Sequence, residues 1–198
     1  GDVVEIDVLD ETEKKGNIIE ILERSNELIR PAVANIDQAL VIFSIVKPQP
    51  NFNLLDRFLI MMGQQGIPCI ICFNKQDLLE SEEDRKKIED HFVGTGYPLI
   101  GISTYTGEGI DQINAYLQGK TTVLAGPSGV GKSTLLKLML GVFHPTSGGL
   151  YLEQGNDRKR LDRSTRKLFA YVPQGNTILS GSIAENMRMV KPEATDEE

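Results

Sequence analysis

Eight residues with the sequence GPSGVGKS, at positions 126–133, match the pattern G-x-x-x-x-G-K-[ST]. They follow the apolar run TTVLAG and precede the helix-like stretch KSTLLKLM, which is the strand–loop–helix context that this pattern requires. Glycines allow backbone N–H groups to turn inward around phosphate oxygens, and a helix N-terminus adds the positive end of a dipole. The pattern therefore predicts a loop that binds the phosphates of a nucleoside di- or triphosphate.

Each residue of this phosphate loop has an expected role. Lys132 is expected to reach the β- and γ-phosphates, and Ser133 to offer its hydroxyl group to Mg²⁺. The alternative is a glycine-rich turn without a ligand. The predicted phosphate-binding residues are Gly126, Pro127, Ser128, Gly129, Val130, Gly131, Lys132, Ser133 and Thr134.

A second motif, NKQD at residues 74–77, ends the apolar run PCIICFN. The Asp77 carboxylate can accept two hydrogen bonds from guanine N1–H and its exocyclic amine, whereas adenine presents no such pair of donors. Asn74 can bridge neighbouring loops and the base, and the aliphatic stem of Lys75 can lie over the ring. A solvated loop is the alternative for a four-residue pattern, but a phosphate loop in the same chain favours guanine recognition.

A third polar segment, GISTYTGEG at residues 101–109, follows the next apolar run. Ser103 lies at the end of that run, and ligands of parallel α/β sheets bind at the carboxyl ends of the strands. We expect Ser103 and the backbone after it to touch the base. A plain strand-to-helix turn is the alternative interpretation.

From residue 38 the sequence alternates between strand-like and helix-like segments, which predicts an α/β fold. The expected architecture is a three-layer sandwich around a mostly parallel sheet, preceded by a small N-terminal β-hairpin formed by residues 3–9 and 17–23. The expected strands lie near residues 38–46, 68–74, 98–103, 121–126 and 168–172, and the expected helices near 51–65, 81–92, 109–119 and 132–143.

The composition of the chain disfavours several classes of function. The 198 residues are 40% hydrophobic and 25% charged, with a net charge of −7 that does not suit nucleic acid or an anionic membrane. No apolar run is long enough to span a bilayer. Cys69 and Cys72 fall on one expected strand and point to opposite faces, so a shared metal site is disfavoured. Two buried free thiols favour a reducing compartment, and we expect a cytoplasmic protein.

The guanine motif precedes the phosphate loop, which reverses the usual order in GTPases. With NELIRPAVANIDQALVIFS, LLDRFL, NKQDL and GKTTVLAGPSGVGKS, this order resembles the circularly permuted ribosome-assembly GTPases of the RsgA (YjeQ) family. The resemblance covers residues 1–134. It implies an oligonucleotide-binding-barrel remnant and linker at residues 1–35, a permuted GTPase core at 36–134, and GTP or GDP with Mg²⁺ as ligands. The sequence departs from the family pattern because it has no D-x-x-G motif and no cysteine after Cys72 for a zinc domain.

Residues 133–198 carry a different resemblance. STLLKLMLGVFHPTSGGLYLE and RSTRKLFAYVPQGNTILSGSIAENM are similar to the nucleotide-binding domain of exporter-type ABC transporters. The resemblance implies that residues 135–198 complete the same α/β domain, that Gln174 is a Q-loop glutamine touching Mg²⁺, and that ATP is a possible nucleotide. The signature motif, the Walker B aspartate and the switch histidine of that family are not found in the sequence.

Together these patterns predict an engineered or recombined chimera of two P-loop families that binds a purine nucleotide, selects guanine and hydrolyses GTP slowly or not at all. Three alternatives stay open: an active GTPase or ATPase, a fold chimera whose nucleotide binding is incidental or lost, and a divergent natural protein. The ribosome and a transporter membrane domain are disfavoured as partners, because the barrel is incomplete and no zinc domain or membrane segment is found. The basic stretch 158–167 is interpreted as a solvated loop, with RNA or partner contact as the alternative.

Overall fold

The computed structural model describes residues 1–10, 15–29, 31–147, 149–154, 157–162, 164–165, 169, 182, 185 and 188. The chain divides into two compact units, Gly1–Arg166 and Lys167–Glu198. In the second unit Glu185 and Arg188 are helical. The Glu185 carboxylate accepts a 2.7 Å hydrogen bond from Ser182 N, and Ser182 Oγ accepts a 3.2 Å bond from Glu185 N. This reciprocal pair is a capping box, which stabilises the start of a helix.

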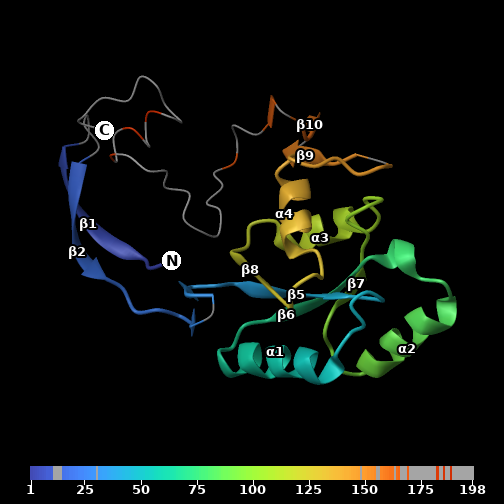
Figure 1. Cartoon of the computed structure of the whole chain (residues 1–198). Coiled ribbons are helices and arrows are strands. Elements are labelled where there is room, and N and C mark those ends of the chain that lie inside the picture. The colour runs from blue at the N-terminus through green and yellow to red at the C-terminus, as the bar shows by residue number, and fades with distance from the viewer. Residues whose placement is uncertain are drawn as a thin grey trace. The chain divides into compact units, whose positions relative to one another are not determined.

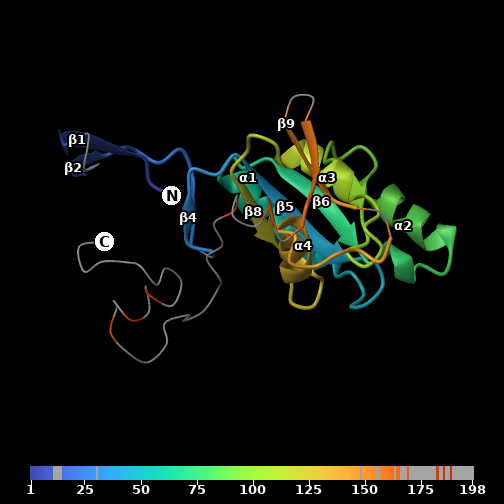
Figure 2. The same ribbon diagram turned by 90° about the horizontal axis from the view of Figure 1, so that it is seen from above.

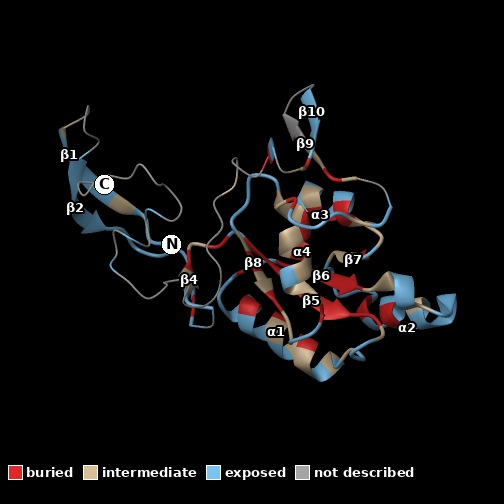
Figure 3. Cartoon of the chain, turned by 45° about the horizontal axis from the view of Figure 1, so that its top comes forward, coloured by how far each residue is buried: buried red, intermediate tan, exposed pale blue. Residues whose placement is uncertain are grey.

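A four-stranded parallel sheet forms the centre of the first unit in the described part of the chain, with the strand order β7-β6-β5-β8. The two central strands are rich in β-branched and apolar residues and are buried along their whole length, as parallel strands covered on both faces must be (Figure 3). The strands are β5 (Gln38–Ser44), β6 (Cys69–Asn74), β7 (Leu99–Gly101) and β8 (Thr122–Ala125).

Helices cover both faces of this sheet, which confirms the predicted three-layer sandwich. α1 (Phe52–Gln64) and α2 (Glu82–Phe92) lie on one face, and α3 (Ile110–Leu117) and α4 (Lys132–Met139) lie on the other (Figures 1 and 2). The apolar side chains of α1 and α2 pack against the buried side chains at alternate positions of β5 and β6. The core residues of this face include Val41, Phe43, Ile71, Phe73, Leu55, Leu59, Met62, Ile88 and Phe92.

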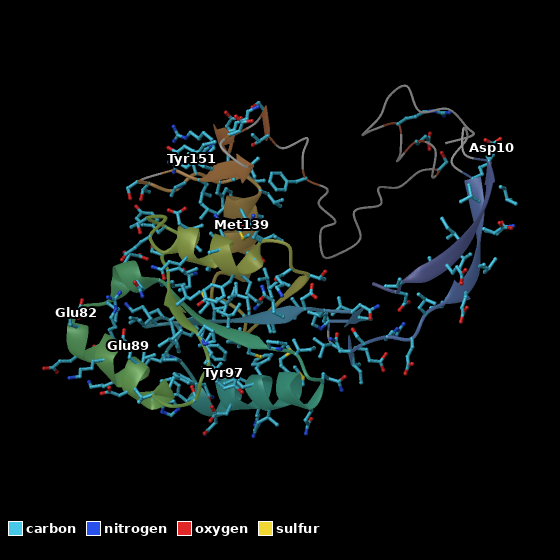
Figure 4. The ribbon with its side chains drawn as sticks, turned by 180° about the vertical axis from the view of Figure 1, so that it is seen from behind. Asp10, Glu82, Glu89, Tyr97, Met139 and Tyr151 are labelled. Carbon is cyan, nitrogen blue, oxygen red and sulfur yellow. The ribbon has the colours of Figure 1, made fainter. Side chains whose placement is uncertain are left out.

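Local sequence signals set the starts of two helices. α1 begins after Asn51, whose side chain accepts a 3.0 Å hydrogen bond from Leu54 N. α2 begins after Ser81, whose hydroxyl oxygen accepts a hydrogen bond from Asp84 N. Its first turn carries three acidic residues, whose negative charges are stabilised by the positive end of the helix dipole. Glu82 and Glu89 point away from the sheet (Figure 4). Both helix starts agree with the predicted boundaries.

The predicted end of the last helix was wrong. α4 stops at Met139 and not at residue 143. Gly141 takes a left-handed conformation with φ +66°, which glycine adopts without a Cβ penalty. Val142 N then donates to Lys137 O at 2.8 Å and Gly141 N to Leu138 O at 2.9 Å, so the helix closes in a Schellman motif. Residues 142 and 143 are therefore released from the helix into the following loop.

Two hairpins flank the sandwich in sequence. The predicted N-terminal hairpin is confirmed as β1 (Val4–Asp10) paired antiparallel with β2 (Lys15–Ile21), and it is followed by the two-residue strands β3 (Glu27–Leu28) and β4 (Val33–Ala34). The second hairpin pairs β9 (Tyr151–Gln154) with β10 (Asp157–Arg160), and it corrects the interpretation of the basic stretch as a loop for residues 158–160, which are solvated as expected but form a strand. β10 is exposed throughout, so its pairing relies on backbone hydrogen bonds rather than an apolar face.

The base of the second hairpin is anchored to the end of α4. Leu150 and Leu161 are buried, and Leu161 N donates to Leu150 O at 2.8 Å. A Cβ added to Gly141 would lie 3.1 Å from Leu161 Cδ2, so the two segments are closely packed. Met139 at the end of α4 and Tyr151 at the start of β9 mark this region in Figure 4.

The strand expected at 168–172 lies, apart from Phe169, outside the described residues. Among the described helices, none has the length and apolar character needed to cross a bilayer.

Candidate functional site

The expected ligand-binding loops follow the carboxyl ends of strands of the one parallel sheet. β5 and β8 are neighbours, but the helices that follow them, α1 and α4, lie on opposite faces of the sheet (Figure 1). This reversal is a topological switch point, where open α/β sheets leave a crevice outside the strand ends. The guanine motif follows β6, residues 103–108 follow β7, and the phosphate loop follows β8. We call residues 103–108 the base loop.

Asn74 connects all three loops. Its side chain is completely buried. Nδ2 donates to Val130 O of the phosphate loop at 2.8 Å and to Thr104 Oγ1 at 3.3 Å. Oδ1 accepts hydrogen bonds from Lys75 N at 2.8 Å and from Thr104 N at 3.0 Å. The geometry thus gives Asn74 the bridging part of its expected role, with its donors and acceptor engaged by protein.

Lys75 also links loops by hydrogen bonds. Its ammonium group donates to Gly129 O in the phosphate loop at 2.8 Å and to Lys47 O in the loop after β5 at 2.5 Å. The residue itself has φ +69°, and the short 3₁₀ helix Gln76–Leu78 begins directly after it. Because the ammonium group is held at both carbonyls, the aliphatic stem is fixed beside the phosphate loop.

Asp77 and Ser103 form a pair at the entrance of the base loop. Ser103 Oγ donates to Asp77 Oδ1 at 2.5 Å and accepts hydrogen bonds from Tyr105 N at 3.2 Å and Thr106 N at 3.0 Å. The Ser103 side chain is fully buried, so its hydroxyl orients the carboxylate. Within the described ranges, Oδ2 of Asp77 has no hydrogen-bond partner. One carboxylate oxygen is therefore fixed by the protein while the other stays available to a ligand.

The phosphate loop approaches the guanine motif closely. Gly131, the residue before α4, has φ +100°, and a Cβ at this position would lie 2.2 Å from Asn74 Nδ2. Any larger side chain would push Asn74 out of its network and strain the backbone. The glycine thus couples the loop conformation to the position of the guanine motif.

Lys132 is folded back on the loop that carries it. Its ammonium group donates to Gly126 O at 2.6 Å and to Pro127 O. Partial burial lowers the pKa of Lys132 below the ordinary value of 10.5, because desolvation disfavours the charged form. A cation held by loop carbonyls lies in the position from which it can reach a phosphate oxygen once those contacts are exchanged.

The proposed metal ligands have weaker support. Ser133 is exposed in the first turn of α4, and the half-buried Thr134 follows it. In the described part of the chain, no group of three or more histidine, cysteine or acidic side chains could hold a metal ion. Gln174 lies outside the described residues. The role of Ser133 as a ligand for Mg²⁺ therefore stays a prediction from the sequence.

A cavity of about 560 Å³ adjoins these groups. Three of the residues that line it were predicted, namely Lys75, Asp77 and Thr134. The other side chains were not predicted. They are Leu78 directly after the guanine motif, two residues of the base loop, whose backbone alone was expected to touch the base, and the segment released by the early end of α4. Gly141 was the available signal, because a glycine after the last periodic residue marks a helix end. The missed lining residues are Leu78, Thr104, Tyr105, Val142, Phe143, His144 and Thr146.

The two cysteines play no part in this cavity. Both are free and buried, as predicted, and burial raises the pKa of Cys69 to about 11 and that of Cys72 to about 12. Cys69 belongs to the core cluster on the α1 and α2 face, and Cys72 does not. The pair is thus structural and unsuited to nucleophilic or redox chemistry at neutral pH.

Comparison with known proteins gives two family matches. The family model described as RsgA GTPase matches residues 21–153, and the model described as ABC transporter matches residues 111–198. The two matches overlap over residues 111–153, which include β8, the phosphate loop and α4. Both resemblances expected from the sequence are therefore found, and the region they share contains the phosphate loop.

Curated relatives agree with the first match. The chain is 48% identical over 163 residues to "Small ribosomal subunit biogenesis GTPase RsgA" of Agathobacter rectalis, covering 82% of this chain and 51% of the relative. It is 51% identical over 140 residues to the protein of the same name from Alkaliphilus metalliredigens, covering 71% of this chain and 48% of the relative. The chain thus spans about half the length of the curated relatives it matches.

Solved structures show the same relationship. The chain superposes on YjeQ from Thermotoga maritima with a TM-score of 0.64 and 30% identity, covering 86% of this chain and 62% of that one. It superposes on YloQ, a circularly permuted GTPase, with a TM-score of 0.60 and 34% identity, covering 83% and 58%. Because the RsgA GTPase model matches 21–153 of the 198 residues and these folds agree, the chain belongs to the RsgA GTPase family.

Proposed function

We propose that this chain is a guanine-nucleotide-binding protein and that the Asp77 carboxylate recognises the guanine base. One observation carries the proposal: the Asp77 carboxylate, held by Ser103 on Oδ1 and without a partner on Oδ2 among the described residues, lines a cavity next to a phosphate loop. Guanine presents two neighbouring donors, N1–H and the exocyclic amine, whereas adenine would leave the carboxylate unmatched. Asp77 is exposed at the cavity, where its free oxygen can accept from the base, and a site that pairs with two base donors favours the ligand that supplies both.

The phosphate side of the site supports a di- or triphosphate ligand. The loop ends at the start of α4, where backbone N–H groups and the helix dipole favour anions. Lys132 is available for a charge-assisted contact to the phosphates, and Ser133 for Mg²⁺. We propose Gly126, Pro127, Ser128, Gly129, Val130, Gly131, Lys132, Ser133 and Thr134 as the phosphate-contacting set.

Hydrolysis is proposed to be slow or absent. Phosphoryl transfer depends on groups that hold the metal and position the attacking water. The sequence has no D-x-x-G motif, and the described residues hold no acidic cluster for a metal. Nucleotide binding does not need these groups, because the phosphate and base contacts are local. Gln174 is the remaining candidate for a metal contact.

A second candidate, ATP binding, is favoured by one specific observation. The ABC transporter match begins at residue 111 and includes the phosphate loop. We infer from the two overlapping matches that the chain joins an RsgA-type core, residues 36–134, to an ABC-type segment, residues 135–198, through their shared loop and helix. The relatives' names refer to small ribosomal subunit biogenesis, and this chain matches about half the length of those relatives.

Isothermal titration calorimetry with GDP, with and without Mg²⁺, tests the proposal. We expect saturable one-site binding that Mg²⁺ strengthens. Titration of Lys132→Ala should show a large loss of affinity, which excludes binding by a contaminant. Phosphate release from GTP should stay at the level of the Lys132→Ala control. Absence of GDP binding would overturn the proposed function, and turnover abolished by Lys132→Ala would overturn the slow-hydrolysis claim.

A further inference from the structure

The cavity beside Asp77 has a second wall that the guanine motif does not supply. Residues 142–146, which we call the wall segment, follow the end of α4 and contribute Val142, Phe143, His144 and Thr146 to the cavity lining. This wall comes from a part of the chain about 65 residues beyond the guanine motif. The inference below rests on the proposed function, because it assigns a role to this wall in base binding.

The start of the wall segment is fixed by the helix end. Val142 N and Phe143 N both donate to Lys137 O, at 2.8 and 3.2 Å, within the Schellman closure of α4. Lys137 Nζ also lies 5.3 Å from the centroid of the Phe143 ring, within the range of a cation–π contact. These contacts hold the Phe143 ring next to the helix end.

The far end of the wall segment is tied to the base loop. Thr146 N and Thr146 Oγ1 both donate to Tyr105 O at 3.0 Å. Ser147 Oγ donates to Thr106 O at 2.9 Å, and Pro145 packs directly on Gly107. The base loop is the same segment whose Ser103 orients Asp77. The wall and the carboxylate are therefore held in a common framework of hydrogen bonds.

The chemistry of the wall suits the face of a nucleobase. Phe143 is 45% exposed and Tyr105 is 65% exposed, and both line the cavity beside Asp77. A carboxylate can read the edge of a purine but offers nothing to its apolar faces. Aromatic side chains bind those faces by stacking, and such stacking is tolerant of base identity because every base has a π-face.

We propose that Phe143 is the stacking platform for the purine base and that residues 142–146 form the outer wall of the nucleotide pocket. Asp77 then determines which base is bound, while Phe143 contributes affinity without selecting the base. The loss of one aromatic–base stack weakens nucleotide binding by about 10- to 100-fold. Removal of the ring should reduce the affinities for GDP and ADP by similar factors.

Calorimetric titration of the full chain with GDP tests this role. Phe143→Ala should weaken GDP binding by about 10-fold or more, and Phe143→Tyr should retain affinity within about threefold, because it keeps a ring. Tyr116→Ala removes a comparably exposed aromatic side chain from α3 outside the cavity lining and should bind GDP like the parent. Thermal unfolding should give similar midpoints for all four proteins, since Phe143 is half exposed.

The outcomes separate the two proposals. If the parent chain binds GDP and Phe143→Ala stays within about twofold of it, the stacking role is wrong and the proposed function stands. An equal loss in Tyr116→Ala would also overturn the stacking role, because the effect would not be local to the cavity. If the parent chain does not bind GDP, the proposed function fails and the role of Phe143 fails with it.

Discussion

The two sides of the candidate site are held in different ways. On the base side, Asn74 and Ser103 are completely buried, and hydrogen bonds fix their polar atoms before any ligand arrives. On the phosphate side, Lys132 rests on the carbonyls of its own loop and must leave them to reach a phosphate. The base side is therefore preorganised as part of the protein core, while the phosphate side must rearrange on binding.

Because the two sides are held differently, we expect their substitutions to have different effects on folding stability and on nucleotide affinity. Substitutions on the base side should damage folding and ligand choice together, because those side chains also support the loops. Substitutions on the phosphate side should damage binding while leaving the fold intact.

Asn74→Ala should have the largest effect. It leaves Val130 O, Thr104 N and Lys75 N without their partner, and buried polar groups left unpaired cost ~1–3 kcal/mol each. We expect the free energy of unfolding to fall by about 3 kcal/mol or more and GDP binding to be lost. Urea denaturation provides the measurement. Asn53→Ala, at an exposed position of α1, is the matched control, and equal stability of the two variants would contradict the preorganised base side.

Lys132→Ala should abolish most nucleotide affinity with little change in stability. The lost contact is charge-assisted, and such hydrogen bonds contribute ~1.5–3 kcal/mol, which corresponds to about 10- to 100-fold in Kd. Calorimetry with GDP measures the loss, and Lys86→Ala on the exposed face of α2 is the charge-matched control. A fall in unfolding free energy as large as that of Asn74→Ala would remove the contrast between the two sides.

The same lysine gives a pH dependence. Burial lowers the pKa of Lys132, so its ammonium form is lost at a lower pH than that of an exposed lysine. A bound phosphate favours the charged form, and GDP affinity should therefore fall as the pH rises through the alkaline range. Titrations at successive pH values check this, and the slope should be smaller in Lys132→Ala, where only the ionisation of guanine N1–H remains.

Asp77→Asn should change ligand choice more than affinity. The new amide can donate to the C2 oxygen of xanthine but no longer accepts two hydrogen bonds from guanine. We expect GDP binding to weaken about tenfold and xanthosine diphosphate binding to improve. Competition between the two nucleotides measures the change. Unaltered preference would show that Asp77 does not contact the base.

Ser103→Ala should have the smallest effect. The substitution removes one hydrogen bond from Asp77 and two acceptor contacts from the base loop. We expect a loss of about 1 kcal/mol in unfolding free energy and a few-fold weaker GDP binding, since the carboxylate remains but is less well oriented. Thermal unfolding and calorimetry on the same preparation provide both values. A GDP affinity lower than that of Asp77→Asn would give Ser103 a direct role at the base.

The sequence predicted those parts of the fold that local patterns determine. β5 and β6 are continuous apolar runs, and α1 and α2 begin at Asn51 and Ser81, whose side chains cap them. The pattern also placed the guanine motif and the phosphate loop at the ends of predicted strands, which the structure shows as β6 and β8. Such features depend on neighbours in sequence, so propensity and periodicity are sufficient to find them.

The missed features depend on contacts between distant residues. β10 carries charged residues and pairs through its backbone, so its side chains give no strand periodicity. The cavity wall depends on hydrogen bonds from Thr146 to Tyr105, which are 41 residues apart. The position of Lys132 follows from the loop carbonyls, which a sequence motif does not describe. The proposed metal contact of Gln174 remains a prediction.

Guanine selectivity is tested most directly by competition between GDP and ADP for the parent chain. A fluorescent GDP analogue would be bound in the presence of Mg²⁺ and displaced with each nucleotide under the same conditions. Because GDP and ADP have the same phosphates and ribose, any difference between their affinities is due to the base. We predict that GDP displaces the analogue at concentrations at least about tenfold lower than ADP. Equal displacement by ADP would contradict the assignment of Asp77 and favour the ATP-binding alternative.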